Sequence, residues 1–253
     1  KEDFDAECRQ YKCLEWGIRN FFGSKKTINF NQGIQGVFHK NFDLVASNFK
    51  EFQSQGYEVY ALTFLYGQKH DKELECAKQI AIKAGAKAHK IINIPLNTWD
   101  GCSLTDPNME IEDGDINRTD IPDTYVPARN MVFLSIAASY ADAMDITDIF
   151  IGVSQVDYSG YIDCREQFIV AMEEAINQGT VLGVEKKQRI KIHAPFMNMT
   201  KADEIALGVK LGVDYGDTWS CYRGDATPCG TCDSCLLRAD AFKQAGCVDP
   251  LIK

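Results

Sequence analysis

The sequence predicts an α/β fold with a doubly wound parallel sheet, followed by a four-cysteine zinc knuckle. Strand and helix patterns alternate along residues 57–212, as right-handed β-α-β units require. Residues 149–151 form a continuous apolar run, Ile-Phe-Ile, which is typical of a central parallel strand covered on both faces. Near the C-terminus, Cys229, Cys232 and Cys235 show the C-x2-C-x2-C spacing of a metal site.

The elements of the first half follow from apolar periodicity and from glycines that end segments. In order, the patterns predict a helix ending near Gly23, a strand over Lys26–Phe30, a helix closing near Gly56, a strand over Tyr57–Phe64, a helix over Lys72–Ala84 and a strand over Lys90–Ile94.

The second half opens with an almost wholly apolar helix over Ala128–Ala143, which leads into a strand over Asp148–Val153. We expect Asp163 to cap the next helix, with Glu166 at the reciprocal position. The inward stripe of that helix is predicted to be Phe168, Met172 and Ile176, and a strand is predicted over Arg189–His193. The last helix of this region should begin with a capping box over Thr200–Asp203, bury Ile205 and Val209, and stop at Gly212.

A long polar loop separates the two halves. Residues 97–126 are rich in Asp, Asn and Pro, and loops of this length in compact domains are usually functional or disordered. We expect the loop to act as a lid over a substrate. The chain as a whole is predicted to divide into an N-terminal extension, an α/β domain, and the knuckle with a C-terminal helix, over residues 1–24, 25–215 and 216–253.

Four cysteines, Cys221, Cys229, Cys232 and Cys235, lie within fifteen residues. Gly230 permits the tight turn by which thiolates point at one centre, as a tetrahedral zinc site requires. An iron-sulfur cluster is the main alternative, but ferredoxin-type runs usually place the fourth cysteine downstream, whereas here it lies upstream. Chance spacing or disulfide pairing is a third interpretation. We expect one structural zinc ion per chain.

Composition restricts the partners. The 253 residues are 45% hydrophobic and 25% charged, as in ordinary globular proteins. The sequence contains no run of 18 apolar residues, the length that would indicate a membrane-spanning helix. The net charge of -9 disfavours direct nucleic-acid binding, which relies on cationic side chains, and favours a small-molecule substrate. Six further cysteines lack metal spacing, which predicts free thiols and a cytoplasmic location.

Polar residues gather at the predicted strand ends, in residues 66–70, 126–130, 154–161 and 195–201. In a doubly wound sheet such loops meet outside the carboxyl ends of the strands, where ligands bind. The crevice that they form is predicted to contain Lys69, His70, Arg129, Asp157, Tyr158, Tyr161 and Lys201.

Three of these residues carry a specific hypothesis beside a plainer one. Arg129 begins a helix, where a cation is unfavourable, so its position indicates either an anionic ligand or an ordinary surface site. His70 is either a solvated surface residue or a catalytic base. Asp157 either binds the edge of a purine-like ring, with Tyr158 or Tyr161 stacked on it, or caps a turn.

The loops and the knuckle together resemble the 7-cyano-7-deazaguanine synthase family of queuosine biosynthesis, in the PP-loop ATPase group. The resemblance implies an adenine nucleotide alpha hydrolase-like, Rossmann-like fold. The similarity covers roughly residues 56–250 and is most specific in Gly-Val-Ser-Gln-Val-Asp-Tyr-Ser-Gly-Tyr, at residues 152–161, and in the four-cysteine spacing. The matching segments are Tyr57–His70, Val126–Leu134, Phe150–Cys164 and Trp219–Arg238.

The resemblance implies an ATP-dependent conversion of 7-carboxy-7-deazaguanine and ammonia to the nitrile. The route would be adenylation, attack by ammonia, a second activation and dehydration, with positioning and charge stabilisation supplying most of the catalysis. The implied roles are zinc binding by the four cysteines; catalysis by Arg129, His70 and Lys69; substrate binding by Asp157, Tyr158, Tyr161 and Asn130; and binding of ATP with Mg2+ by Gly33, Gly36, Thr63, Phe64 and Lys201.

The nucleotide loop departs from this family, whose signature is Ser-Gly-Gly-x-Asp-Ser after the first strand, where small residues let backbone amides bind pyrophosphate. The chain has no such string, and its nearest segment, Asn31–Gly36, keeps Gly33. We expect an active synthase with a diverged, degenerate loop. The alternatives are a pseudoenzyme or binding protein that keeps the deazaguanine site without ATP cleavage, and a relative that joins the activated carboxylate to another acceptor, such as a protein. A homodimer is also compatible with the sequence.

Overall fold

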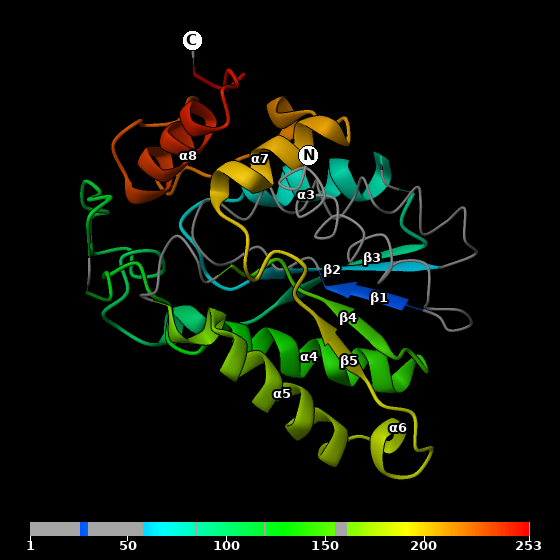
Figure 1. The fold of residues 1–253 in the computed structure, drawn as a ribbon. Helices are drawn as coiled ribbons and strands as arrows, with labels where there is room; N and C mark the ends of the chain where they lie inside the picture. The colour runs from blue at the N-terminus through cyan, green and yellow to red at the C-terminus, as the bar shows by residue number, and fades with distance from the viewer. Residues whose placement is uncertain (1–25, 30–57, 84, 119, 155–160, 253) are drawn as a thin grey trace.

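The computed structural model of the chain describes residues 26–29, 58–83, 85–118, 120–154 and 161–252. Strands and helices alternate along these residues (Figure 1). The strands are β1 (Lys26–Asn29), β2 (Val59–Leu65), β3 (Ala88–Asn93), β4 (Asp148–Phe150) and β5 (Lys191–His193). The α-helices are α3 (Lys72–Lys83), α4 (Arg129–Ala143), α5 (Glu166–Gly179), α6 (Val181–Val184), α7 (Lys201–Lys210) and α8 (Asp233–Gln244), and short 3-10 turns cover Leu96–Thr98, Ile162–Cys164 and Tyr215–Asp217.

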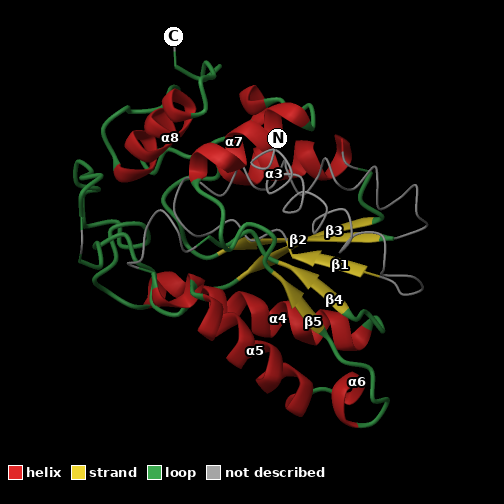
Figure 2. Cartoon of the chain, viewed as in Figure 1, coloured by secondary structure: helices red, strands yellow, loops and turns green. Residues whose placement is uncertain are grey.

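The described strands form one parallel sheet in the order β3-β2-β1-β4-β5. β1 is central: Ile28 pairs with Ala61 of β2 on one side and with Phe150 of β4 on the other. α3, α7 and α8 lie on one side of the sheet, and α4 and α5 cover the other (Figure 1, Figure 2). The doubly wound parallel sheet is therefore confirmed, and the strand order reverses between β1 and β4.

The core lies between the sheet and α4. Phe64 of β2 stacks on Phe133 of α4, with ring centroids 4.3 Å apart and an interplanar angle of 13°. Both faces of β2 are covered, so every residue from Val59 to Phe64 is buried. Each large apolar side chain buried in this way contributes roughly 1.5–3 kcal/mol. No helix among the described residues combines the length and hydrophobicity that a membrane span needs.

The predicted strands and helices of this region are confirmed, and their boundaries shift by a few residues. β2 begins at Val59 instead of Tyr57, and β4 ends at Phe150 instead of Val153. The backbone N–H of Ile151 still donates to the carbonyl of His193 at 2.9 Å, so hydrogen bonding to β5 continues one residue past the end of β4. The helices predicted before Gly23 and Gly56 lie outside the described residues.

The prediction that Asp163 caps α5 is wrong. The N-cap of α5 is Arg165, and it makes no capping side-chain bond. Asp163 lies in the preceding 3-10 turn, where its Oδ2 accepts a hydrogen bond of 3.0 Å from the backbone N–H of Asn130. The carboxylate therefore caps the first turn of α4, a helix more than thirty residues earlier, because the turn packs against that helix end.

The helix α7 confirms the predicted capping box of Thr200 and Asp203. Ile205 is fully buried as predicted, but Val209 is 51% exposed, so that prediction is wrong. Gly208 is buried instead and lies against the hydroxyl of Tyr215. The helix stops as predicted, because Gly212 has a φ of +76° and allows the terminal turn.

The inward stripe of α5 is confirmed, since Ile176 is buried and Phe168 and Met172 pack against the core. The long polar region contains no strand and no helix beyond the turn at Leu96–Thr98, within the part of it that the structure describes. It is nevertheless anchored, because Cys102 and Val126 belong to the main core cluster.

Candidate active site and metal centre

The sulfur atoms of Cys221, Cys229, Cys232 and Cys235 lie within 4.8 Å of one another. Gly230 has a φ of +77° and makes the turn inside the run. The backbone N–H of Cys229 donates to the sulfur of Cys221 at 3.3 Å, and that of Cys232 donates to the sulfur of Cys229 at 3.4 Å. All four are free cysteines in the structure, and the group can bind a metal ion.

The start of α8 favours thiolates at this position. Cys232 is the N-cap residue of α8 and Cys235 lies in its first turn, where the helix dipole stabilises negative charge. Hydrogen bonds from the Cys232 and Cys235 thiols hold the pKa of Cys221 well below its usual value, and the bond that Cys232 gives to Cys221 raises the pKa of Cys232 to about 12. These neighbours therefore stabilise negative charge on the sulfur of Cys221.

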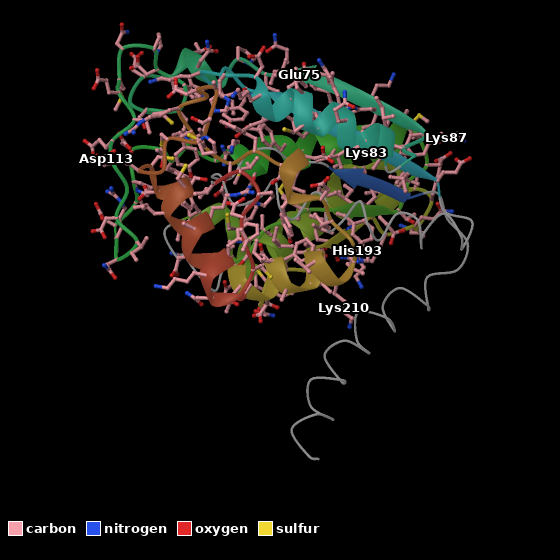
Figure 3. The ribbon with its side chains drawn as sticks, turned by 90° about the horizontal axis from the view of Figure 1, so that it is seen from above. Glu75, Lys83, Lys87, Asp113, His193 and Lys210 are labelled. Atoms are coloured by element: carbon pink, nitrogen blue, oxygen red, sulfur yellow. The ribbon has the colours of Figure 1, made fainter. Side chains whose placement is uncertain are left out.

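Arg223 ties the knuckle to the long polar loop. Its Nη2 donates to the carbonyl of Ile111 at 2.9 Å and to Oδ1 of Asp113 at 2.8 Å, while Nη1 donates to Oγ1 of Thr231 at 2.6 Å. Hydrogen bonds from Thr231 and Arg223 lower the pKa of Asp113. Figure 3 shows Asp113 at the outer edge of the molecule.

A second contact joins the same loop to α8. The backbone N–H of Gly114 donates to the carbonyl of Thr231 at 2.8 Å, and that of Asp115 donates to Oδ1 of Asp233 at 2.7 Å. A Cβ atom at position 114 would lie 2.3 Å from the backbone nitrogen of Asp233, so this approach requires glycine. The region predicted as a lid is thus fastened along the knuckle, and its action as a lid stays a prediction.

The N-terminus of α4 is held in an unusual conformation. Ala128, its N-cap residue, has a φ of +51° and makes no side-chain capping bond, which is a costly conformation for a residue other than glycine. The Tyr125 hydroxyl accepts from the N–H of Ala128 at 3.1 Å. Asn130 is fully buried, and its Nδ2 donates to the carbonyl of Asp163 at 2.9 Å.

Arg129, the first residue of α4, is 2% exposed. Its Nη1 donates to the Tyr66 hydroxyl at 3.2 Å, and its guanidinium carbon lies 5.1 Å from the centre of the Tyr66 ring. Burial alone would lower the pKa of Arg129, but the neighbouring Tyr66 and Asp163 hold it above its usual value. Its Nε has no partner among the described residues.

Tyr161 is buried in the same region. Its hydroxyl shares a hydrogen bond of 3.2 Å with Oγ1 of Thr124, and its ring centroid lies 5.7 Å from that of Tyr125. Tyr161 also contributes to the raised pKa of Arg129. The structure therefore brings together three predicted site residues: Arg129, Asn130 and Tyr161.

Lys69 and His70 contact the loop and the knuckle instead of Arg129. The Lys69 backbone N–H donates to the carbonyl of Leu104 at 3.2 Å, and its amine donates to the carbonyl of Met109. His70 packs on Gly224, where an added Cβ would lie 2.4 Å from Cβ of His70. The catalytic roles given to Lys69 and His70 stay predictions.

The described residues that are predicted to bind the nucleotide come from two elements, β2 and α7. Thr63 and Phe64 are fully buried in β2, where Oγ1 of Thr63 lies 2.8 Å from Nε2 of His89, so a nucleotide would have to meet their backbone. Lys201 begins α7, and its amine donates to Glu204 at 2.9 Å. Gly33 and Gly36, like the predicted substrate residues Asp157 and Tyr158, lie outside the described residues.

Sequence reasoning misses three residues around Arg129, namely Tyr66, Asp163 and Tyr222. Tyr66 directly follows β2, and Tyr222 directly follows Cys221 of the four-cysteine group. Their positions next to features that the sequence does reveal could have marked them as candidate site residues. Asp163 is predicted to act on the wrong helix, since nothing local in the sequence shows that its turn meets α4.

The fold and the site define a doubly wound α/β protein with a buried arginine at the start of α4 and four clustered thiols around the start of α8. The chain belongs to the queuosine biosynthesis protein QueC family, which it matches over residues 48–246. This confirms the family resemblance predicted from the sequence. The matched range begins after the segment that contains Gly33 and Gly36.

Named relatives agree with this assignment. The chain is 54% identical over 199 residues to the 7-cyano-7-deazaguanine synthase of Clostridium kluyveri, covering 79% of this chain and 88% of that protein. It is 48% identical over 203 residues to the synthase of Syntrophus aciditrophicus, covering 78% and 87%. Among solved structures, the U34-tRNA thiolase NcsA from Methanococcus maripaludis with its 4Fe-4S cluster has a TM-score of 0.44 and 13% identity, over 94% of this chain and 72% of that one.

Proposed function

We propose that the chain is a carbon-nitrogen ligase that converts 7-carboxy-7-deazaguanine and ammonia into 7-cyano-7-deazaguanine with ATP. Its high identity to proteins named as 7-cyano-7-deazaguanine synthases supports this activity. The observation that carries the proposal is the buried Arg129 beside Tyr66, because a guanidinium at a strained helix N-terminus is suited to an anionic or polarised oxygen of a ligand.

The reaction requires two activations. The substrate carboxylate attacks the α-phosphorus of ATP and releases pyrophosphate, and ammonia then displaces AMP from the acyl adenylate to give the amide. A second ATP activates the amide oxygen in the same way, and loss of AMP and of the nitrogen-bound protons gives the nitrile. Arg129 and the Tyr66 hydroxyl would stabilise the negative charge that develops on oxygen in these steps.

ATP would bind beside the central strands. The central strand β1 pairs with β2 on one side and with β4 on the other, and the strand order reverses between β1 and β4. Ligands of doubly wound sheets bind in the crevice outside this point. Nucleotide roles for Gly33, Gly36 and Lys201, with Mg2+ on the phosphates, belong to the same proposal.

Zinc is the proposed metal of the knuckle. Four thiolates about 2.3 Å from one tetrahedral ion lie about 3.8 Å apart, and the sulfur atoms here lie within 4.8 Å of one another, with Cys229 and Cys235 at 3.9 Å. A 4Fe-4S cluster binds each of its four thiolates to a different iron and therefore needs a wider separation of the sulfur atoms. Four protein ligands leave no open position, so the zinc would be structural, and metal analysis should find one zinc ion per chain.

The activity test supplies purified protein with 7-carboxy-7-deazaguanine, ATP, magnesium and ammonium, and measures nitrile and AMP by mass spectrometry. Nitrile formation with two AMP per nitrile is the expected result. Protection by the substrate without AMP would point to a deazaguanine-binding pseudoenzyme. AMP formation without nitrile would point to a different acceptor, such as a protein.

The proposed partners follow from this chemistry. The substrate is a small deazapurine, no direct nucleic-acid contact is needed, and the reducing environment suited to four thiolates is the cytoplasm. A homodimer is part of the same proposal, and sedimentation velocity at several protein concentrations would detect it.

A further inference from the structure

The helix α4 begins without a capping side chain from its own N-cap residue. Ala128 occupies that position with a φ of +51° and makes no side-chain capping bond. Helices usually start with a Ser, Thr, Asp or Asn whose oxygen accepts from the second or third helical N–H. A residue other than glycine in the left-handed region is also costly. Other contacts must therefore hold this helix end, and Arg129, on which the proposed function depends, is its first residue.

Asp163 supplies the missing cap from a distant part of the chain. Its Oδ2 accepts a hydrogen bond of 3.0 Å from the backbone N–H of Asn130, the second residue of α4. Nδ2 of Asn130 in turn donates to the backbone carbonyl of Asp163 at 2.9 Å. The two residues are 5% and 0% exposed, so both hydrogen bonds are shielded from water. The pair forms, across 33 residues of sequence, the reciprocal arrangement of a capping box.

The carboxyl group of Asp163 has no local use that would explain its burial. The N-cap residue of the following helix, α5, is Arg165, so Asp163 does not cap its own segment. Oδ1 has no partner among the described residues, and the one side-chain hydrogen bond that the carboxyl group makes within them goes to α4. Because burial of a carboxyl group is costly, the start of α4 is the structural reason for its position.

Arg129 lies between the strained Ala128 and the tethered Asn130, so both of its neighbours fix its backbone. Its side chain is 2% exposed, and Nη1 donates to the Tyr66 hydroxyl at 3.2 Å. A misplacement of about 1 Å in a reacting group can lower a rate about a hundred-fold. Release of the first turn of α4 would therefore displace Arg129 from its position beside Tyr66.

We propose that Asp163 is a positioning residue for the reaction: it caps α4 from the turn at Ile162–Cys164 and thereby fixes the Arg129 guanidinium beside Tyr66. The inference rests on the proposed function, in which Arg129 stabilises negative charge on oxygen. In this role Asp163 touches no reacting atom and acts through the backbone of α4.

Two substitutions at position 163 test the role. Asp163→Ala removes the cap and should lower kcat about ten- to hundred-fold, with the KM for 7-carboxy-7-deazaguanine changed less than about three-fold, because Arg129 is proposed to act as charge develops. Asp163→Asn keeps an oxygen that accepts from the Asn130 N–H, and asparagine caps helices about as well as aspartate. This variant should recover kcat to within about five-fold of the wild type.

Asp142→Ala is the matched control. Asp142 also caps a helix that is distant in the sequence, since its Oδ1 accepts from the backbone N–H of Leu182 at 2.7 Å and its Oδ2 from that of Val181 at 3.1 Å, both at the start of α6. It lies near the opposite end of α4 from Arg129. Asp142→Ala should lower the urea midpoint, as Asp163→Ala does, and leave kcat unchanged. An equal loss of kcat in the two alanine variants would overturn the proposal.

Hydrogen exchange reports on the cap without any assay of activity. Exchange at the Arg129 and Asn130 amides should be about ten-fold faster in Asp163→Ala than in the wild type, as the loss of one hydrogen bond predicts, and unchanged in Asp142→Ala. Unchanged exchange in Asp163→Ala would overturn the cap itself.

The failures of this inference and of the proposed function differ. A wild-type chain that forms no nitrile overturns the proposed function and, with it, the part of Asp163 in the reaction. An active wild type whose Asp163→Ala variant keeps its kcat, or whose Asp163→Asn variant is as slow as Asp163→Ala, overturns the positioning role alone.

Discussion

Arg238 illustrates how strongly the contribution of an ion pair to the free energy of unfolding depends on burial. Its side chain is 1% exposed and donates from Nε and Nη2 to Asp249, and from Nη1 to Oγ1 of Thr218 at 2.9 Å. Removal of one partner of such a pair leaves a buried charge uncompensated. The ion pair of Lys186 and Asp145 is the contrasting case, since its side chains are 45% and 60% exposed.

Arg238→Met should lower the free energy of unfolding by about 3–5 kcal/mol, whereas Lys186→Met should change it by less than about 1 kcal/mol. Urea denaturation followed by circular dichroism measures both. Equal effects of the two substitutions would show that Asp249 is satisfied without Arg238.

Residue-level predictions succeed where partners lie close together in the sequence. Thr200 and Asp203 are three residues apart, and their capping box forms as predicted. Asp163 fails as a cap for α5 because its partner, Asn130, lies 33 residues away. The unpartnered atoms of Arg129 and Asp163 could not be predicted at all, because burial at those positions depends on tertiary packing.

At the scale of elements, two helical glycines give opposite expectations. A Cβ on Gly208 in α7 would lie 1.9 Å from the Tyr215 hydroxyl, whereas nothing lies within 4 Å of a Cβ on Gly179 at the end of α5. Alanine is the better helix former by about 1 kcal/mol, and only the second site can use that advantage.

Gly208→Ala should therefore lower the free energy of unfolding by about 1–3 kcal/mol, the usual cost of overpacking. Gly179→Ala should raise it by about 0.4–1 kcal/mol. Chemical denaturation measures both changes, and the steric argument would be refuted by a Gly208→Ala protein as stable as the wild type.

The contact between the knuckle and the long loop is a second feature at the scale of elements, because it holds two distant segments together. Arg223 holds the loop through Ile111 and Asp113, so Arg223→Gln should speed hydrogen exchange at the Gly114 and Asp115 amides about ten-fold, as loss of a bond or two predicts. Mass spectrometry of the loop peptides measures this.

Arg189→Gln is the control for that exchange experiment. Arg189 is 60% exposed and pairs with Glu173 and Glu174 on α5. Its replacement should leave exchange in the loop unchanged, and equal acceleration by both variants would mean that Arg223 does not hold the loop specifically.

Whole-molecule stability should depend on the ionisation of His89. Burial, with a smaller effect of Lys78, lowers the pKa of His89 below its usual value of about 6.5. Between the lowered pKa and the unfolded value, the unfolded chain binds more protons than the folded one, so stability rises with pH in that window and falls as the pH drops below about 6.5.

His89→Asn should therefore show a smaller loss of stability than the wild type when the pH is lowered from about 7.5 to about 5.5. Urea denaturation at several pH values measures the slope. Above about pH 7.5 the two proteins should have the same slope, and identical slopes below about pH 6.5 would contradict the assignment to His89.

The sequence anticipates the doubly wound sheet because each strand and helix has its own local period and because parallel connections allow few topologies. It cannot anticipate the register that pairs Thr27 with both Tyr60 and Ile149, since pairing across long separations depends on packing. The site divides in the same way. The four cysteines are predictable as a local motif, while the burial of Tyr66, Asp163 and Tyr222 depends on which loops meet.

The position of the knuckle also has a consequence for folding during synthesis. Its four ligands lie within fifteen residues and close only short loops, so metal capture can be fast, whereas the pairing of β1 with β4 closes a long stretch of chain and is slow. A ribosome releases the knuckle after all five described strands. The four-cysteine segment and α8 are therefore the last part of the described fold to leave the ribosome, and the local closure of that segment follows the synthesis of the whole sheet.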